Sequence, residues 1–168
     1  DQLIQEEADI TCTDISMDRP FSLLTHQKIV RDYINLYTPY RGLLLYHGLG
    51  SGKTCSSIAI AEGLKVKNDV IVMTPASLRR NYLEELKKCG DHLYKKKQYW
   101  EFLSTKDDEP KTSLLSNVLR IPKDYIRKAG GVWMTDASKP SNLEDLSKDN
   151  RISLDAQIEI MISNKYQF

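Results

Sequence analysis

The sequence of 168 residues has no long hydrophobic run and few cysteines, and each scarcity excludes a class of protein. No apolar stretch approaches the roughly 18–20 residues needed to cross a bilayer. The first residues do not resemble a signal peptide. An odd number of cysteines at wide spacing predicts neither a disulfide framework nor a zinc site, the three being Cys12, Cys55 and Cys89. With no membrane segment, we expect a soluble, intracellular protein in a reducing compartment.

The composition is typical of one globular domain. Hydrophobic residues make up 40% and charged residues 28% of the chain, which argues against a disordered tail or a fibrous repeat. The net charge of +1 is unevenly distributed, since residues 1–20 have six acidic and one basic residue, whereas residues 21–100 have thirteen basic and six acidic ones. The basic middle of the chain indicates where an anionic partner would bind, without identifying that partner.

Helical and strand-like patterns alternate between residues 21 and 90. Apolar residues at helical spacing predict helices, and short apolar runs predict strands buried on both faces. In chain order the pattern predicts a helix over 22–36, a strand over 42–46, a helix over 53–64, a strand over 70–73 and a helix over 78–88. This alternation builds a parallel sheet covered by helices, so the predicted fold class is α/β.

The two ends of the chain are expected to be peripheral. Residues 1–20 have weak apolar periodicity, and we interpret them as a leader or a partner-binding arm. We interpret residues 91–168 as a mostly helical insertion or elaboration. Its expected elements are helices near 112–119, 122–129 and 153–163, a strand over 132–135, and the beginning of another strand over 165–168.

The most informative segment is the glycine-rich sequence His-Gly-Leu-Gly-Ser-Gly-Lys-Thr over 47–54, between a predicted strand and a predicted helix. Glycines let the backbone curl so that successive N–H groups face an anion, and a helix N-terminus adds partial positive charge. Lys53 would bind the β and γ phosphates, and the Thr54 hydroxyl would bind magnesium. The spacing predicts a nucleoside triphosphate site formed by Gly48, Gly50, Ser51, Gly52, Lys53 and Thr54. A turn that only reverses the chain is the alternative.

Two nearby features have a functional and a structural interpretation. His47 stands where the usual motif has its first glycine, and we interpret it as a spacer that packs the loop and not as a base or metal ligand. Residues 94–102 interleave three lysines with aromatic residues. Such a segment suits single-stranded nucleic acid. We favour the alternative, a helix whose aromatic residues pack inward while its lysines face water.

The loop segment also carries a family resemblance. Residues 43–63 resemble motif I of superfamily 2 helicases and helicase-like ATPases, a group that includes DEAD/DEAH-like and Swi/Snf-related proteins. The resemblance is strongest to helicases of nucleocytoplasmic large DNA viruses, in which an aromatic residue, a histidine and a glycine precede the loop. Here those residues are Tyr46, His47 and Gly48.

Two further segments resemble motifs of the same superfamily. Residues 24–27 resemble the glutamine motif, which implies that Gln27 recognises adenine, and a glutamine amide does match the donor and acceptor of that base. Residues 70–78 resemble motif Ia, which implies contact with a nucleic-acid backbone. Thr74, Ser77 and Arg79 offer suitable hydroxyl and guanidinium groups at the end of a predicted strand. The alternatives are an ordinary surface glutamine and a solvated helix start.

The resemblance implies a fold, an activity and partners. Residues 21–90 would be the front part of the first RecA-like lobe of a P-loop ATPase, using ATP and magnesium with Lys53 and Thr54 as catalytic residues. DNA or RNA would bind through its backbone, and a second RecA-like lobe would follow C-terminally. A viral origin would place the protein in the host cytoplasm or the virion.

Hydrolysis also needs an acidic residue that holds magnesium. The family places it in an Asp-Glu pair after an apolar strand, and no such pair follows one here. Asp136, after the predicted strand over 132–135, is the one candidate. We therefore expect an N-terminal part of an ATPase that is inactive alone. A nucleotide-binding regulatory or scaffold module that never hydrolyses is the alternative. A small kinase is disfavoured, because it has no use for the helix before the loop strand.

Overall fold

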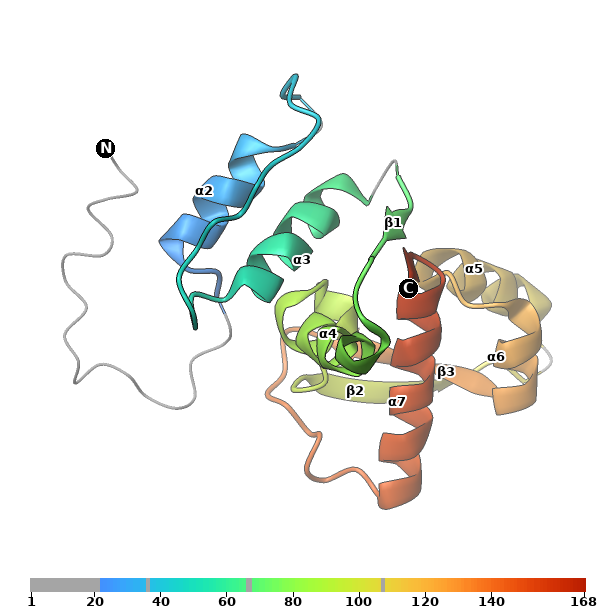
Figure 1. Ribbon diagram of the computed structural model, residues 1–168. Coiled ribbons are helices and arrows are strands. Elements are labelled where there is room, and N and C mark those ends of the chain that lie inside the picture. Colours follow the sequence, from blue (N-terminus) through green and yellow to red (C-terminus); the bar gives the residue numbers. More distant parts are fainter. Residues whose placement is uncertain (1–21, 36, 66–67, 107) are drawn as a thin grey trace.

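The computed structural model describes residues 22–168 except 36, 66–67 and 107, so the expected arm over 1–20 lies outside the described residues. In chain order the elements are α2 (Thr25–Tyr33), α3 (Lys53–Leu64), β1 (Val70–Ile71), α4 (Ala76–Cys89), the 3-10 helix η2 (His92–Tyr94), β2 (Tyr99–Ser104), α5 (Glu109–Leu119), α6 (Lys123–Ala129), β3 (Gly131–Asp136), α7 (Lys148–Ser163) and β4 (Tyr166–Gln167) (Figure 1). None of the described helices has the length and apolar character that crossing a membrane requires.

Every helix that the sequence predicts is present, with shifts at the ends, except the one favoured over 94–102. The expected strand over 70–73 is reduced to β1, which pairs in parallel with β4 so that Val70 lies opposite Tyr166 and Ile71 opposite Gln167. The second strand of this pair is the one expected near 165–168. The protein therefore combines helices with a small parallel sheet, a mixture compatible with the α/β class.

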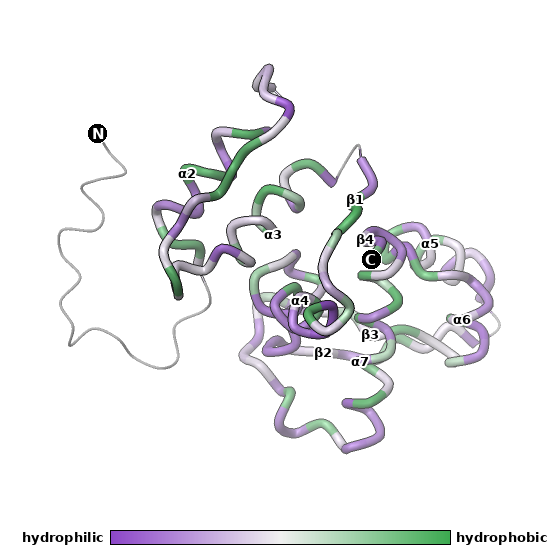
Figure 2. The backbone as a smooth tube through the Cα atoms, in the orientation of Figure 1, coloured by the Kyte–Doolittle hydropathy of each residue, from purple (hydrophilic) through white to green (hydrophobic). Residues whose placement is uncertain are grey.

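The expected buried strand over 42–46 is wrong. These residues have no regular secondary structure, and the Leu44 and Tyr46 side chains are 85% and 94% exposed. Figure 2 shows hydrophobic residues along this uncovered segment. A strand forms only when its N–H and C=O groups pair with a neighbour, and no strand among the described residues pairs with this one. The apolar pattern therefore identifies a segment that could be buried in a sheet. Among the described residues, neither sheet includes it.

The later part of the chain contains an antiparallel ribbon in addition to the expected helices. Strand β2 pairs with β3 from Tyr99 opposite Asp136 to Ser104 opposite Gly131. The expectation of a helix over 94–102 is wrong, because these residues form the end of η2 and part of β2. The inward packing of aromatic residues is confirmed for Tyr94 and Trp100, which are both buried.

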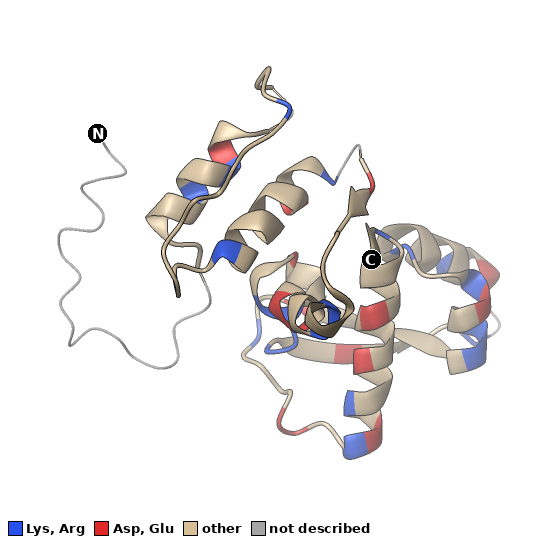
Figure 3. Cartoon of the chain, in the orientation of Figure 1, with Lys and Arg blue, Asp and Glu red and all other residues tan. Residues whose placement is uncertain are grey.

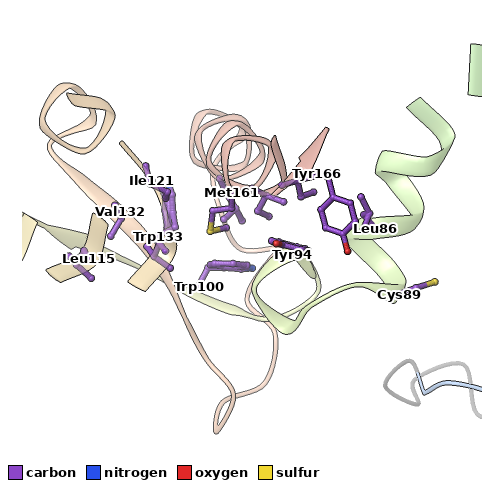
Figure 4. Close-up of a cluster of buried hydrophobic side chains, with 14 of the residues drawn as sticks. Leu86, Cys89, Tyr94, Trp100, Leu115, Ile121, Val132, Trp133, Met161 and Tyr166 are labelled. Atoms are coloured by element: carbon purple, nitrogen blue, oxygen red, sulfur yellow. The ribbon is translucent and has the colours of Figure 1, made fainter. Parts of the chain in front are cut away.

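The hydrophobic core lies where α4, η2, the ribbon and α7 meet. Figure 4 shows its side chains converging from these elements and from the segment before α6. The largest fully buried members are aromatic and branched aliphatic residues, which contribute most to burial energy: Trp100, Tyr166, Ile58, Leu86, Ile121, Ile126, Leu154, Ile158, Ile162 and Val132. This core supports α3 through Ile58 and leaves α2 outside it.

Amide side chains close both outer edges of the ribbon. The Trp133 N–H donates to Gln157 Oε1 at 2.7 Å, and Gln157 Nε2 donates back to the Trp133 carbonyl at 2.8 Å. On the opposite edge, the Trp100 N–H donates to Asn142 Oδ1 at 2.8 Å, and Asn142 Nδ2 donates to the Trp100 carbonyl at 3.0 Å. Each amide imitates the hydrogen-bonding pattern of a further strand at one residue of each edge, so the outward backbone groups of Trp100 and Trp133 are paired.

An ionic cluster holds the C-terminal end of α3. Lys65 pairs with Glu62 and with Asp91, the latter at 2.6 Å, and Glu62 accepts the Tyr166 hydroxyl proton at 2.5 Å. Burial opposes the charge on Asp91, but the Lys65 ammonium and the Leu93 N–H outweigh it and hold the Asp91 pKa below its usual value. Burial and the adjacent Glu62 carboxylate raise the pKa of Tyr166. Tyr166 therefore stays neutral, and its hydroxyl donates a hydrogen bond to the Glu62 carboxylate.

Removing the Gln157 amide tests its role at the ribbon edge. We expect Gln157→Leu, which keeps most of the side-chain volume, to lower the free energy of unfolding by about 1–3 kcal/mol for each buried backbone group of Trp133 left unpaired. Asn142→Ala should act in the same direction. The exposed residue Asn117 on α5 provides a control, because Asn117→Ala should stay within about 0.5 kcal/mol. Urea unfolding measures all three variants, and equal midpoints would contradict the role of the amides.

Candidate phosphate-binding site

The glycine-rich loop ends at the N-terminus of α3. Gly50 and Gly52 have φ angles of 79° and 74°, in the left-handed region that glycine adopts without steric cost. Gly52 caps the helix, so Lys53 and Thr54 are its first two residues. The first N–H groups of a helix have no partner within the helix and attract anions. The structure thus gathers the residues expected to bind phosphate at one helix end, with few charged residues on the rest of α3 (Figure 3).

The Lys53 side chain bends back over the loop. Its ammonium donates to the carbonyl of Gly48 at 2.8 Å and to that of His47 at 3.2 Å. The Ser51 hydroxyl donates to the same Gly48 carbonyl at 2.9 Å. Lys53 is exposed. A phosphate that enters the loop would therefore compete with two neutral carbonyls for this ammonium, and charged acceptors form the stronger hydrogen bonds.

Two adjacent residues of α2 hold the loop from the other side. Gln27 Nε2 donates to the Gly52 carbonyl at 3.2 Å, while its Oε1 accepts the Leu24 N–H at 3.0 Å. His26 Nε2 donates to the Ser51 carbonyl at 2.9 Å. Gln27 is 3% exposed, so its interpretation as an ordinary surface residue is wrong. Its expected contact with adenine stays a prediction.

His26 contacts the loop, although it was not among the site residues predicted from the sequence. Its one signal in the sequence was its position next to Gln27, because neighbouring residues at a helix start can both face the same loop. The His26 ring also packs edge-on against His47, with ring centroids 5.4 Å apart. That contact agrees with the interpretation of His47 as a residue that packs the loop.

The three residues expected to contact nucleic acid are all exposed around the start of α4. Thr74 follows β1, and Ser77 and Arg79 lie in the first turn and a half of α4. The Arg79 guanidinium lies over the Phe168 ring, 5.3 Å from its centroid. In the described part of the chain, no hydrogen bond or ion pair connects these three residues to the glycine-rich loop.

Helices α3 and α4 are joined directly. The Ser57 and Tyr82 hydroxyls lie 3.3 Å apart, and Cys55 and Cys89 form a disulfide with their Cα atoms 5.5 Å apart. The cysteine spacing predicted neither a disulfide framework nor a zinc site, and this single disulfide was not expected from it. The two cysteines are separated by 34 residues in the sequence, and only the packing of the two helices brings them together.

Asp136 does not join the loop. It ends β3 in the antiparallel ribbon, accepts hydrogen bonds from the Ser138 hydroxyl and N–H, and pairs with Lys139 at 3.2 Å. These interactions, the Ser138 hydrogen bonds first, hold its pKa below the usual value. Asp136 is thus engaged in a local turn, which gives no support to a role as the magnesium-binding acid.

Comparison with known proteins identifies relatives in large DNA viruses. The chain is 36% identical over 132 residues to a protein of Acanthamoeba polyphaga mimivirus named "Putative ATP-dependent RNA helicase", and the match covers 76% of the chain. A second mimivirus protein of the same description is 34% identical over 114 residues, and a "Putative helicase" of frog virus 3 (isolate Goorha) is 43% identical over 70 residues. These matches cover 64% and 39% of the chain, respectively.

The chain is a relative of helicase-like proteins from nucleocytoplasmic large DNA viruses. The resemblance noted for the loop segment is thereby confirmed. The chain spans only 21%, 10% and 7% of the length of these three curated relatives. No family model matches the chain, and no solved structure matches it.

Two glycines of the loop provide a matched test of its geometry. A methyl group on Gly52 would meet the Gln27 amide nitrogen and would also force alanine into the left-handed region, which alone costs about 1–2 kcal/mol. Gly48 has a negative or extended φ and open space around it. We expect Gly52→Ala to lower the free energy of unfolding by at least that amount, and Gly48→Ala by less than about 0.5 kcal/mol. Equal losses in thermal or urea unfolding would contradict this arrangement.

Proposed function

We propose that this chain is the ATP-binding part of a helicase-type ATPase that acts on nucleic acid. The position of Lys53 and Thr54 at the start of α3, behind a loop with two left-handed glycines, carries the proposal. The names of the viral relatives support a helicase-like ATPase. The activity, the substrate and the partners of the whole protein are likewise proposed.

Each residue of the loop has a role in holding the triphosphate. The N–H groups of Gly50, Ser51 and Gly52 would surround the phosphate oxygens, and the α3 N-terminus would add its partial positive charge. Lys53 would leave the His47 and Gly48 carbonyls and bind the β and γ phosphates. The Thr54 hydroxyl fits a magnesium ion, which would neutralise part of the phosphate charge.

Gln27 would recognise adenine through the hydrogen-bonding groups that its contacts with the loop leave free. Its amide uses one hydrogen of Nε2 for the Gly52 carbonyl and one lone pair of Oε1 for the Leu24 N–H. One hydrogen and one lone pair therefore remain. They match the donor and acceptor of an adenine edge. The Gln27 side chain would then contact both the base and the Gly52 carbonyl.

The nucleic-acid backbone would bind at the start of α4. Thr74, Ser77 and Arg79 are exposed there, and their hydroxyl and guanidinium groups suit phosphate oxygens of DNA or RNA. The magnesium-binding acid and a second RecA-like lobe would lie C-terminal to residues 1–168. A regulatory module that binds nucleotide and never hydrolyses it is the second candidate, favoured by the engagement of Asp136 away from the loop.

Replacing Lys53 tests the nucleotide site. We expect Lys53→Ala to weaken binding of a fluorescent ATP analogue in the presence of magnesium by about 10- to 100-fold, since a hydrogen bond to a charged group contributes about 1.5–3 kcal/mol. Lys148→Ala, at the exposed start of α7, should leave the affinity unchanged. Equal affinity of both variants would contradict the phosphate-binding role. In the complete protein, turnover that disappears in Lys53→Ala favours the ATPase, and binding without turnover favours the regulatory module.

Replacing Arg79 tests the nucleic-acid site. We expect Arg79→Ala to weaken binding of single-stranded DNA or RNA to the complete protein about equally for all sequences, because the contact is to phosphate. The slope of log affinity against log salt should fall in magnitude by about 0.7. Fluorescence anisotropy at several salt concentrations measures this slope, with Lys148→Ala as the control. An unchanged slope would remove Arg79 from the interface.

A further inference from the structure

Cys55 and Cys89 join the helix that begins at the phosphate loop to the end of α4. Cys55 is the third residue of α3, directly after Lys53 and Thr54, and Cys89 is the last residue of α4. Their side chains are 8% and 7% exposed. Figure 4 shows Cys89 at the edge of the hydrophobic cluster, beyond Leu86. The pair is therefore next to the loop and outside the centre of the core.

The surroundings of the pair are suited to thiol chemistry. Glu85 lies one turn before Cys89, and its Oε2 is 3.5 Å from the Cys55 sulfur and 3.7 Å from the Cys89 sulfur. Lys88 holds the other oxygen of this carboxylate at 2.9 Å. Packing of two apolar sulfurs needs no carboxylate beside them, whereas removal of a thiol proton needs a base within this reach.

The two cysteines lie at helix ends whose partial charges have opposite sign. Cys55 is in the first turn of α3, where the partial positive charge of the helix end stabilises a thiolate, and Cys89 is at the C-terminal end of α4, where the partial charge is negative. In the reduced form Cys55 is therefore the attacking sulfur and Cys89 the resolving one.

We propose that Cys55 and Cys89 form a reversible redox site that locks the phosphate-loop helix α3 to α4, with a low-molecular-weight disulfide such as glutathione disulfide as the oxidant. The Cys55 proton passes to Glu85, and the Cys55 thiolate attacks one sulfur of the oxidant. This step forms a mixed disulfide and releases one small thiolate, which takes the proton from Glu85. Cys89 then attacks the Cys55 sulfur, its proton passes to Glu85, and the second small thiolate leaves. The protein loses two electrons and two protons, and the oxidant becomes two thiols.

The disulfide connects the helix of the proposed nucleotide site to the helix of the proposed nucleic-acid site. Helix α3 begins with Lys53 and Thr54, and α4 carries Ser77 and Arg79 near its start. A covalent link between Cys55 and Cys89 fixes the beginning of α3 against α4. This consequence, unlike the redox site itself, rests on the proposed nucleotide site.

The alternative is that the same residues bind a metal ion. Three possible ligand atoms lie within 4.8 Å of one another, on Cys55, Glu85 and Cys89. Among the residues that the structure describes, this is the one group of this kind. A structural zinc site takes four protein ligands, and the two sulfurs here are bonded to each other. The observations therefore favour the disulfide, and zinc binding is an outcome of the test.

Peptide mapping in redox buffers tests the site. The complete protein is equilibrated with mixtures of reduced and oxidised glutathione, quenched with acid, alkylated and digested. We expect a linked peptide containing Cys55 and Cys89 that increases with the oxidised fraction and disappears with dithiothreitol. Cys12→Ser should give the same linked peptide, and Cys55→Ser should give none. Alkylation of both cysteines at every ratio, linkage to Cys12, or zinc that protects both thiols without linkage would overturn the redox site.

Nucleotide binding by the two forms tests the lock separately. We expect the affinity for a fluorescent ATP analogue to differ about fivefold or more between the oxidised and reduced forms, and to be independent of redox state in Cys89→Ser. Equal affinities of the two forms would overturn control of the loop. If the linked peptide forms and neither form binds the analogue, the proposed nucleotide site fails and the redox site stands.

Discussion

The packing of α3 between α2 and α4 is the constraint on which the candidate site depends. At the start of α3, Gln27 and His26 hold the carbonyls of Gly52 and Ser51. Along its length, contacts with α4 include a disulfide and a pair of hydroxyls. At its end, the Lys65 cluster connects it to η2 and β4. A helix held at both ends keeps its unpaired N–H groups in one direction, which is what an anion-binding loop requires.

The two small sheets differ in how complete they are. In the ribbon of β2 and β3, Gln157 and Asn142 pair the outward backbone groups of Trp133 and Trp100, one residue on each edge. The parallel pair of β1 and β4 is only two residues long, and the apolar segment over 42–46 beside the loop is uncovered. The buried core therefore lies around the ribbon and α7, whereas the glycine-rich loop follows an exposed apolar segment.

Most helices and the strands β3 and β4 were predictable, whereas the strand over 42–46, the helix over 94–102 and the strand pairings were not. Residues 53–64 were expected as a helix from local spacing alone, and α3 has these bounds. The apolar run over 42–46 has the composition of a strand, but a strand also needs a partner that its own sequence does not contain. The burial of Gln27 and the disulfide between Cys55 and Cys89 were missed for the same reason, because each depends on a second helix packing against the first. Within the candidate site, the loop could be identified from its glycines, and its contacts with α2 could not.

By itself, the sequence determined the positions of most helices, the order of the glycines before Lys53 and Thr54, and the similarity to viral helicase-like proteins. All three depend on residues close together in the chain, where periodicity and backbone sterics act directly. Only the tertiary structure decided that two residues of α2 hold the loop, that Cys55 meets Cys89, and that amides close the ribbon. Those contacts join residues 24 to 42 positions apart. They form only when separate elements pack together, and hydrophobic burial, which drives that packing, is non-directional and names no partner in advance.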